Sequence, residues 1–516
     1  MSASTEKKLR REAREAGIDK KAEAAKAEAA KKAKEKRRWA LVAAGLIVLV
    51  VVALILGSGL PYKMNAYTVA DEKFSAAEVN YQYGSQYMNF VNNYGSYASI
   101  FGLDTSNGPV GLEDQECYMM EGGSWKDYFL DAAKTAMVQT VALRDYAEEN
   151  GISLNEQDVA DVDAAFVGLD EQVKALGFST VDQFFSANYG AGVNEDIARR
   201  GFYSSALSGK VIDVVSDGFS YTDAELEEQY KSYNGAQDIF DYLYYVVAAE
   251  TLETETEDGE TASEVTEDSL KAAKEKAEAI VKAFETAEGE DLEAKFNDAI
   301  LSVDVNGFAT EQRSAGANII AAHDWMLDDA RAEGDIVCEE NSTGTGYYVV
   351  LFQGRDDNHY NLVNVRHILV KAMADENGVY TDEAKAAAKA DAEAVLKEFE
   401  AGDKTEESFA ALAEIYSEDE GSYLDGGLYS NVAKGQMVEE FDAFCFEGHK
   451  SGDTAIVYGE SSAYAGYHVM YFVGEGQQYS DYIAENELLT NDVSAWMEEI
   501  CAAYEGKEGF GMRLVG

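Results

Sequence analysis

The longest uninterrupted run of hydrophobic residues lies near the start of the chain, from Trp39 to Leu56. It contains no charged side chain and continues through small residues to Leu60. A helix over 39–60 is long enough to cross a hydrocarbon core of about 30 Å. The pattern therefore predicts a single transmembrane helix at residues 39–60.

The charges before this stretch predict its orientation. Residues 1–38 carry twice as many basic as acidic side chains and end in Lys36-Arg37-Arg38. Basic flanks stay in the cytoplasm, so we expect a basic cytoplasmic segment at 1–38 and the bulk of the chain outside. A cleaved signal peptide is the alternative, but the stretch is longer than the apolar region of such peptides.

Residues 61–234 have the spacing of amphipathic helices, interrupted by breaks that contain Gly and Asn. The clearest segments are Ser85–Tyr94, Trp125–Asn150 and Glu156–Leu176. The frequent aromatic residues have two interpretations: they pack the helices together, or they form an apolar surface that binds unfolded chains. We expect one helical domain over 61–234.

An internal repeat follows the helical region. Residues 239–247 and 362–370 are strand-like apolar runs, and each leads through a charged loop into a helix with one apolar face. Each unit closes with a similar strand, at 346–354 and 466–474. Two copies of one α+β domain explain this pattern.

These patterns predict an α+β chain in which an N-terminal transmembrane helix precedes a helical domain and two tandem repeats. We place the first repeat at 235–357 and the second at 360–476. The pattern over residues 477–516 predicts a C-terminal helix with a short tail.

Composition narrows the range of functions. The chain has 96 acidic and 42 basic side chains, a net charge of −54, and such a field repels nucleic acid and anionic lipid. The four cysteines form no C-x-x-C motif, which argues against a zinc site; disulfides and buried free thiols both stay open. No nucleotide-binding, hydrolase or metalloprotease motif occurs, so we expect no metal and no cofactor.

The second repeat contains an ordered set of short motifs. In sequence order they are Val365-Arg366-His367-Ile368-Leu369-Val370, Phe409-Ala410-Ala411-Leu412-Ala413, Tyr416-Ser417-Glu418-Asp419, Gly426-Gly427-Leu428, Gly435-Gln436-Met437-Val438-Glu439-Glu440-Phe441, Phe446 and Gly466-Tyr467-His468. Each motif alone is weak, but the whole set over residues 363–475 resembles the parvulin family of peptidyl-prolyl cis/trans isomerases.

The resemblance implies a four-stranded antiparallel sheet wrapped by helices, and it assigns roles to residues. His367 and His468 match the family's paired histidines, and Asp419 matches the position beside the substrate amide. The pocket for the proline ring matches Leu428, Met437, Phe441 and Phe446. A lone histidine in an apolar strand is more often structural, so the prediction depends on the set and not on His367 alone.

The chemistry suits a pocket of this kind. Rotation about a peptide bond has a barrier of about 18–20 kcal/mol, and Xaa–Pro isomerisation is slow without a catalyst. No covalent step is needed. A dry pocket that holds the proline ring and fits the twisted amide lowers the barrier.

Some positions depart from the family pattern. The first repeat has no histidine at the matching strands, where Leu243 or a neighbour and Tyr348 stand instead. We therefore expect a non-catalytic copy that serves as a spacer or a binding surface. In the second repeat, the turn 425–429 lacks the family's Asp before Leu428, which leaves the shape of the turn open. The loop after Val370 has no arginine cluster, so phosphoserine-proline specificity is not expected.

The order of the parts is similar to that of the SurA and PrsA foldase chaperones. This resemblance implies that the helical domain and the C-terminal helix pack together as a chaperone domain. We expect a membrane-anchored, extracytoplasmic peptidyl-prolyl isomerase and chaperone that acts on unfolded or newly exported polypeptides with Xaa-Pro bonds. A holdase with little or no isomerase activity is the alternative. A surface-binding or adhesive protein that reuses these folds is a third hypothesis.

Overall fold

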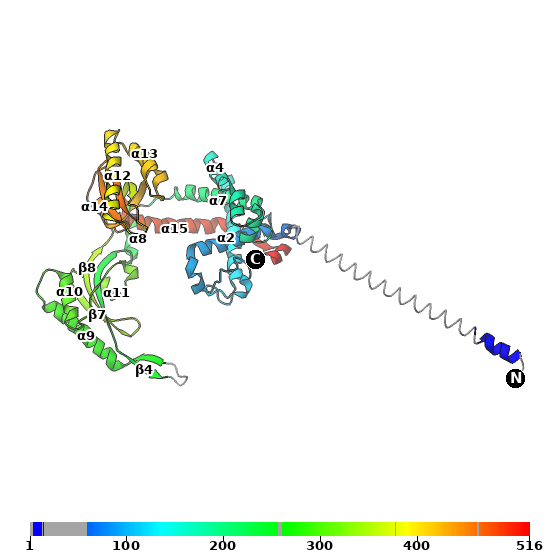
Figure 1. The fold of residues 1–516 in the computed structure, drawn as a ribbon, viewed down its shortest axis with the longest axis horizontal. Coiled ribbons are helices and arrows are strands. Elements are labelled where there is room, and N and C mark those ends of the chain that lie inside the picture. The colour runs from blue at the N-terminus through cyan, green and yellow to red at the C-terminus, as the bar shows by residue number, and fades with distance from the viewer. Residues whose placement is uncertain (1–3, 13, 15–58, 256–260, 377, 462–463) are drawn as a thin grey trace. The chain divides into compact units, whose positions relative to one another are not determined.

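The computed structural model describes residues 4–12, 14, 59–255, 261–376, 378–461 and 464–516 (Figure 1). All of the predicted transmembrane helix except its last two residues lies outside these ranges. Within them, no helix combines the length and the apolar character needed to cross a membrane. The chain divides into two compact units, residues 1–219 with 492–516, and residues 220–491.

The first unit is mainly helical, with one small antiparallel sheet of strand order β13-β1-β2. Its strands are β1 (Asn65–Val69), β2 (Glu72–Ser75) and β13 (Gly506–Glu508). Its α-helices are α2 (Ala76–Tyr94), α3 (Trp125–Asn150), α4 (Glu156–Ala164), α5 (Leu169–Ala175), α6 (Val181–Tyr189) and α7 (Glu195–Ser216). Short 3-10 helices are η1 (Leu60–Lys63), η2 (Gly95–Phe101), η3 (Leu112–Asp114) and η6 (Phe510–Leu514).

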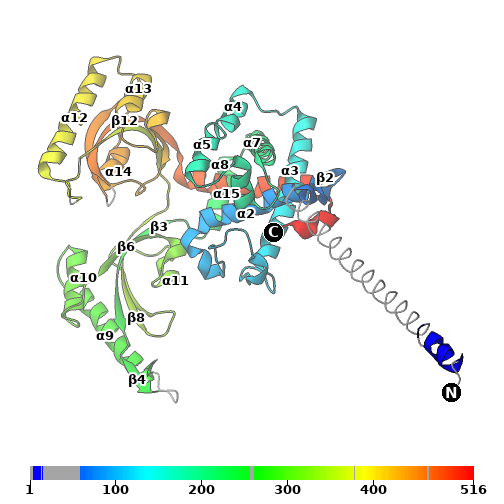
Figure 2. The same cartoon turned by 45° about the vertical axis from the view of Figure 1, so that its right-hand side comes forward.

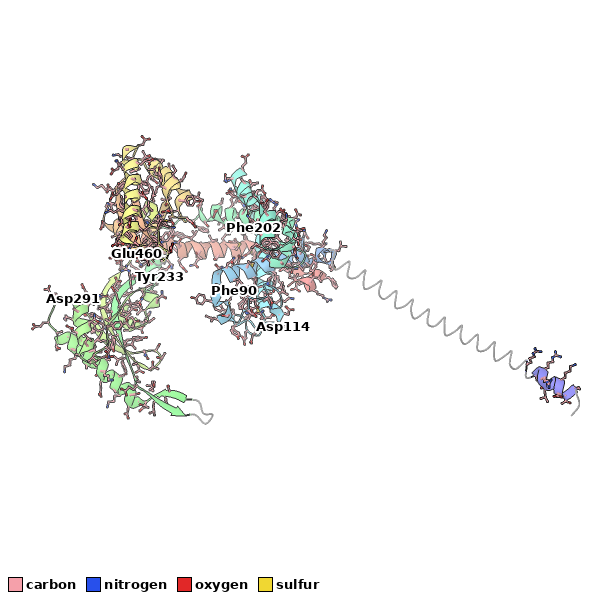
Figure 3. The ribbon with its side chains drawn as sticks, in the orientation of Figure 1. Phe90, Asp114, Phe202, Tyr233, Asp291 and Glu460 are labelled. Carbon is pink, nitrogen blue, oxygen red and sulfur yellow. The ribbon has the colours of Figure 1, made fainter. Side chains whose placement is uncertain are left out.

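An aromatic cluster between α2 and α3 forms the core of this unit. The ring of Phe90, labelled in Figure 3, lies 4.9 Å from that of Trp125 and 5.8 Å from that of Phe129. Tyr94 and Tyr97 remain 43% and 65% exposed. The packing interpretation therefore holds for the buried aromatic residues, whereas binding of unfolded chains by the exposed ones stays a prediction.

The end of the chain completes the same unit. Helix α15 (Tyr479–Cys501) contributes Trp496 and Ile500 to a cluster with Leu143 of α3 and Val211 of α7. Strand β13 then pairs with β1. The first and last segments of this unit, which are far apart in sequence, thus share one core.

The second unit holds α8 (Asp223–Ser232) and two four-stranded antiparallel sheets. The first repeat contains β3 (Ile239–Ala248), β4 (Thr251–Glu255), β5 (Thr261–Val265), α9 (Glu267–Thr286), α10 (Leu292–Leu301), β6 (Thr310–Ala315), η4 (Gly316–Asn318), α11 (His323–Met326), β7 (Ile336–Glu340) and β8 (Gly346–Asp356). The second contains β9 (Asn361–Lys371), α12 (Asp382–Ala401), α13 (Glu406–Tyr416), η5 (Tyr423–Asp425), β10 (Leu428–Val432), α14 (Glu439–Phe446), β11 (Thr454–Glu460) and β12 (Ala465–Gln478).

The two sheets have the same topology. Their strand orders are β6-β3-β8-β7 and β10-β9-β12-β11, so each sheet has the repeat's first and last strands at its centre. In the second repeat α12 and α13 cover one face and α14 the other (Figure 2). In the first repeat α9 and α10 cover the corresponding face (Figure 1). The prediction of an α+β fold is confirmed.

The strand register aligns the repeats residue by residue. Ala248 pairs with Gly346 in the first sheet, and Lys371 pairs with Gly466 in the second. The fourth residue before Ala248 is Tyr244 and the fourth before Lys371 is His367. Tyr244, the neighbour of Leu243, therefore stands where the second repeat has His367.

Candidate active site

Two buried histidines lie side by side on the α14 face of the second sheet. His367 pairs with Met470 across the two central strands and His468 pairs with Leu369, so their side chains project from the same face. They are 3% and 4% exposed. Their Nδ1 atoms are 2.9 Å apart and their rings stack at 5.1 Å.

Asp419 completes a hydrogen-bonded row with the histidines. The loop that carries it follows α13 and is fixed to β9, since the Glu418 amide donates to the Leu369 carbonyl at 2.9 Å. Asp419 Oδ2 lies 2.9 Å from His367 Nε2 and also receives the Ser422 hydroxyl at 2.5 Å.

The environment sets the charges in this row. The hydrogen bond with His367 is the main reason why the pKa of Asp419 is held far below its usual range. Burial lowers the pKa of His468 to about 3. At neutral pH the site therefore contains a carboxylate and a neutral His468.

An apolar wall faces the histidines. The ring of Phe441 on α14 lies 5.4 Å from each histidine ring. Met437, just before α14, is half-buried in the same cluster. Phe446 at the end of α14 also belongs to it, and its ring meets that of Tyr360 at 5.6 Å.

Leu428 is not brought to this wall. It pairs with Arg366, whose side chain projects from the face opposite to His367, whereas Tyr429 pairs with Val365 on the histidine face. The Tyr429 hydroxyl donates to Asp419 Oδ2 at 3.1 Å. Tyr429 thus holds the place at the site that the sequence assigns to Leu428.

Two glycines shape the turn that the sequence left open. Gly426 and Gly427 have φ angles of 65° and 73°, a region that favours glycine. The Gly427 carbonyl accepts a hydrogen bond from the His367 amide at 2.8 Å. A Cβ atom on Gly427 would lie 2.1 Å from the His367 carbonyl oxygen, so the turn needs glycine to reach β9.

Three side chains that contact the row were not found from the sequence: Ser422, Tyr429 and Tyr464. The Tyr464 hydroxyl lies 3.0 Å from His468 Nε2. Only the alternation of side chains between the two faces of β10 could have indicated that Tyr429, and not Leu428, faces the histidines. Ser422 and Tyr464 reach the site through a loop and a hairpin end, and no spacing rule indicates that.

The first repeat keeps the positions but not the chemistry. Tyr244 and Tyr348 replace the histidines, with ring centroids 6.0 Å apart. Asp304 follows α10 as Asp419 follows α13, but its Oδ2 accepts from the Tyr245 hydroxyl at 2.6 Å. No imidazole is present in this row.

Residues 348–472 match the family model described as the PPIC-type PPIASE domain. The chain carries a parvulin-type peptidyl-prolyl isomerase domain. This confirms the prediction of a parvulin-type enzyme, and the matched residues include the whole histidine–aspartate row.

The chain is also similar to known foldases. Over 145 residues it is 30% identical to the chaperone SurA of Chromohalobacter salexigens, covering 26% of this chain and 30% of that protein. The chain therefore spans less than a third of this relative's length. The structure of PrsA from Bacillus subtilis matches 74% of this chain and 89% of its own at 15% identity, with a TM-score of 0.30. That of PrsA from Bacillus anthracis matches 28% and 59% at 20% identity, with a TM-score of 0.18.

Proposed function

We propose that the chain is a membrane-anchored foldase that isomerises Xaa-Pro bonds in exported polypeptides and holds these clients while they fold. His367, Asp419 and His468 form the active site of this proposal. The single observation that supports it is the hydrogen-bonded row of these three side chains, in which the two histidines are buried, against Phe441.

The proline ring of a client binds against Phe441 and Met437, where apolar side chains exclude water. Phe446 extends the same apolar cluster away from the histidines. Phosphate recognition is not part of the proposal. The expected substrate is an unmodified Xaa-Pro segment of an unfolded chain.

The charge of Asp419 assists rotation of the amide. In the planar amide, resonance places partial negative charge on the carbonyl oxygen, and twisting the C–N bond reduces that charge. A carboxylate beside the oxygen therefore raises the energy of the planar form more than that of the twisted form, and this destabilisation of the ground state lowers the barrier. His367 holds Asp419 in place and is itself held by His468, and no covalent bond is broken.

Exchange NMR on an Ala-Pro peptide with the whole chain tests this site. We expect wild type to broaden the cis and trans resonances, and His367→Ala/Asp419→Ala to remove the broadening. His323→Ala is the matched control, because His323 lies on α11 with its side chain 45% exposed. Equal broadening by wild type and the double variant would exclude the site.

The proposed location is outside the cytoplasm, with residues 39–60 as the anchor and residues 1–38 inside. The charge asymmetry around the apolar stretch supports this orientation. We expect the whole chain to stay with membranes after a carbonate wash and a variant without residues 39–60 to be released. Release of both proteins would exclude the anchor.

A holdase without isomerase activity is a second candidate, and exposed apolar side chains on the first unit favour it. Tyr97, Ile100 and Tyr118 are 65%, 67% and 69% exposed. If holding is the whole function, His367→Ala/Asp419→Ala suppresses client aggregation as well as wild type does, and neither protein isomerises the peptide. If the first proposal holds, the double variant keeps the holding activity and loses the isomerisation.

A further inference from the structure

Tyr464 lies at the outer end of the histidine row, beyond the residues that the sequence assigns to the site. Its hydroxyl is 3.0 Å from His468 Nε2 and its ring meets the imidazole at 5.7 Å. The Tyr464 carbonyl accepts the Ser461 amide at 2.8 Å. This bond holds the backbone of Tyr464 at the start of β12.

The protonation of the two histidines sets the direction of the hydrogen bonds in the row. An ionised carboxylate only accepts hydrogen bonds, so His367 Nε2 donates to Asp419. His468 is the neutral ring, because burial lowers its pKa. In the form of the row in which His367 is neutral too, His367 Nδ1 accepts and receives the proton of His468 Nδ1, 2.9 Å away. His468 Nε2 then has no proton and accepts from the Tyr464 hydroxyl.

The phenol of Tyr464 keeps the proton that this direction requires. Burial is the main cause that raises the pKa of Tyr464, and the nearby carboxylates of Asp419 and Glu440 add to it. Tyr429 on β10, whose hydroxyl donates to Asp419, is a further titratable group beside the row. The groups that face His468 thus favour a neutral phenol as the donor to its Nε2.

The sheet also leaves room for this contact. A Cβ atom on Gly459 of β11 would lie 2.7 Å from His468 Nε2 and 3.1 Å from the Tyr464 hydroxyl. Gly459 pairs with Gly466 across the two strands. A side chain at residue 459 would separate the imidazole from the phenol.

We infer that Tyr464 is a positioning residue of the isomerase site, whose hydroxyl caps His468 Nε2 and keeps the single proton of His468 on Nδ1, facing His367. The inference rests on the proposed function for its effect on catalysis. Without the cap, a buried ring nitrogen loses its donor. That nitrogen is then open to protonation, and the ring is free to turn away from His367.

The test is Tyr464→Phe in the whole chain, read by ¹⁵N NMR of labelled histidine and by peptide exchange. The chain has five histidines, so single substitutions assign the His468 signal. We expect His468 Nε2 to take up a proton at higher pH than in wild type. The kcat falls about tenfold, as for loss of one hydrogen bond, and KM stays unchanged because Phe441 is intact.

A second variant and two controls make the test specific. Gly459→Ala pushes the phenol and imidazole apart and should reproduce the titration change. Tyr467→Phe removes a neighbouring hydroxyl, and Gly474→Ala adds a methyl group on β12 where no atom lies within 4 Å. Both controls should titrate as wild type does.

The outcomes separate the two proposals. If wild type isomerises the peptide but Tyr464→Phe matches it in rate and in the titration of His468, the cap is wrong and the active site stands. If wild type does not isomerise but the titration moves as expected, the proposed function is wrong and the cap stands.

Discussion

Asp419 is the residue on which the charge of the site depends. Its Oδ2 receives hydrogen bonds from His367, Ser422 and Tyr429. Asp419→Asn replaces the acceptor with a neutral amide that cannot accept as strongly. We expect kcat/KM to fall at least tenfold and the second repeat to lose about 1 kcal/mol, a low value for a charged hydrogen bond because the carboxylate is partly exposed.

Peptide exchange and thermal unfolding of the whole chain measure both effects. Glu420→Gln is the matched control, since it removes an exposed charge from the same loop. An Asp419→Asn protein as active as Glu420→Gln would show that the charge of Asp419 is not used.

The burial of His468 predicts how stability depends on pH. The folded-state pKa is lowered to about 3, whereas an unfolded histidine protonates near 6.5. Between these values the unfolded chain binds more protons, so the free energy of unfolding decreases as the pH falls from about 6.5 towards 3. The limit for one such group is about 1.4 kcal/mol per pH unit.

Hydrogen exchange of the β9 and β12 amides measures how the free energy of unfolding of the second repeat changes with pH. His468→Asn has no group to titrate at this position, so we expect its stability to fall less between pH 6.5 and 4.5. The low pKa of Asp419 also makes the free energy of unfolding decrease as the pH falls, but at lower pH. Wild type and His468→Asn share this effect. Parallel slopes would contradict the burial of a neutral His468.

The family resemblance made most residues of the site predictable, including Asp419 in the loop after α13. His367, His468 and Phe441 come from regular elements, and the structure brings them together. Tyr464 and Ser422 depend on a hairpin end and a loop, whose geometry no periodicity encodes. Leu428 was assigned to the pocket although the pairing with Arg366 turns it to the other face. A shift by one residue exchanges the two faces of a strand.

At the scale of elements, the turn before β10 is the most demanding connection in the second repeat. Gly427 has a φ of 73°, and a Cβ atom there would lie 2.1 Å from the His367 carbonyl oxygen. We expect Gly427→Ala to cost about 3 kcal/mol or more, because left-handed strain and a backbone clash add up. Isomerase activity should fall with it, since His367 donates its amide proton to this turn.

Gly448→Ala is the matched control for that turn. Gly448 has a φ of 81° but no atom within 4 Å of the added Cβ, so only the strain of about 1–2 kcal/mol remains. Urea unfolding followed by hydrogen exchange in β9 compares the two variants. Equal losses of stability would mean that the approach to His367 is not tight.

Element types were easier to predict than element partners. The apolar positions of the second repeat's helix predicted its buried face, and Ala392, Val395 and Phe399 are buried there. The exchange of His367 for Tyr244 in the first repeat was located only to within a neighbour of Leu243. The cross-strand register identifies Tyr244 as the matching residue. The similarity of the two strand sequences alone does not determine that register.

At the scale of the whole chain, the sequence predicted which segments are repeated but not how the repeats join their flanking helices. A buried polar group forms one such junction within the second unit. Asp238, at the entrance to β3, is 3% exposed. It accepts from Arg355 Nε at 2.6 Å and from the Tyr230 hydroxyl at 2.8 Å, while Asn358 donates to the same hydroxyl at 2.9 Å. None of these residues belongs to a recognisable motif.

Removing the cation from this junction should destabilise the first repeat strongly. Arg355→Met leaves the Asp238 carboxylate buried without a partner charge, at a cost of about 3–5 kcal/mol. Arg313→Met is the matched control, because the Arg313–Asp241 pair is 45% and 37% exposed and such pairs contribute about 0–1 kcal/mol. Calorimetry of the whole chain compares the two. Asp238→Asn/Arg355→Met should recover part of the lost stability, since no buried charge then remains. Equal shifts of the unfolding temperature for Arg355→Met and Arg313→Met would contradict a buried charge at this junction.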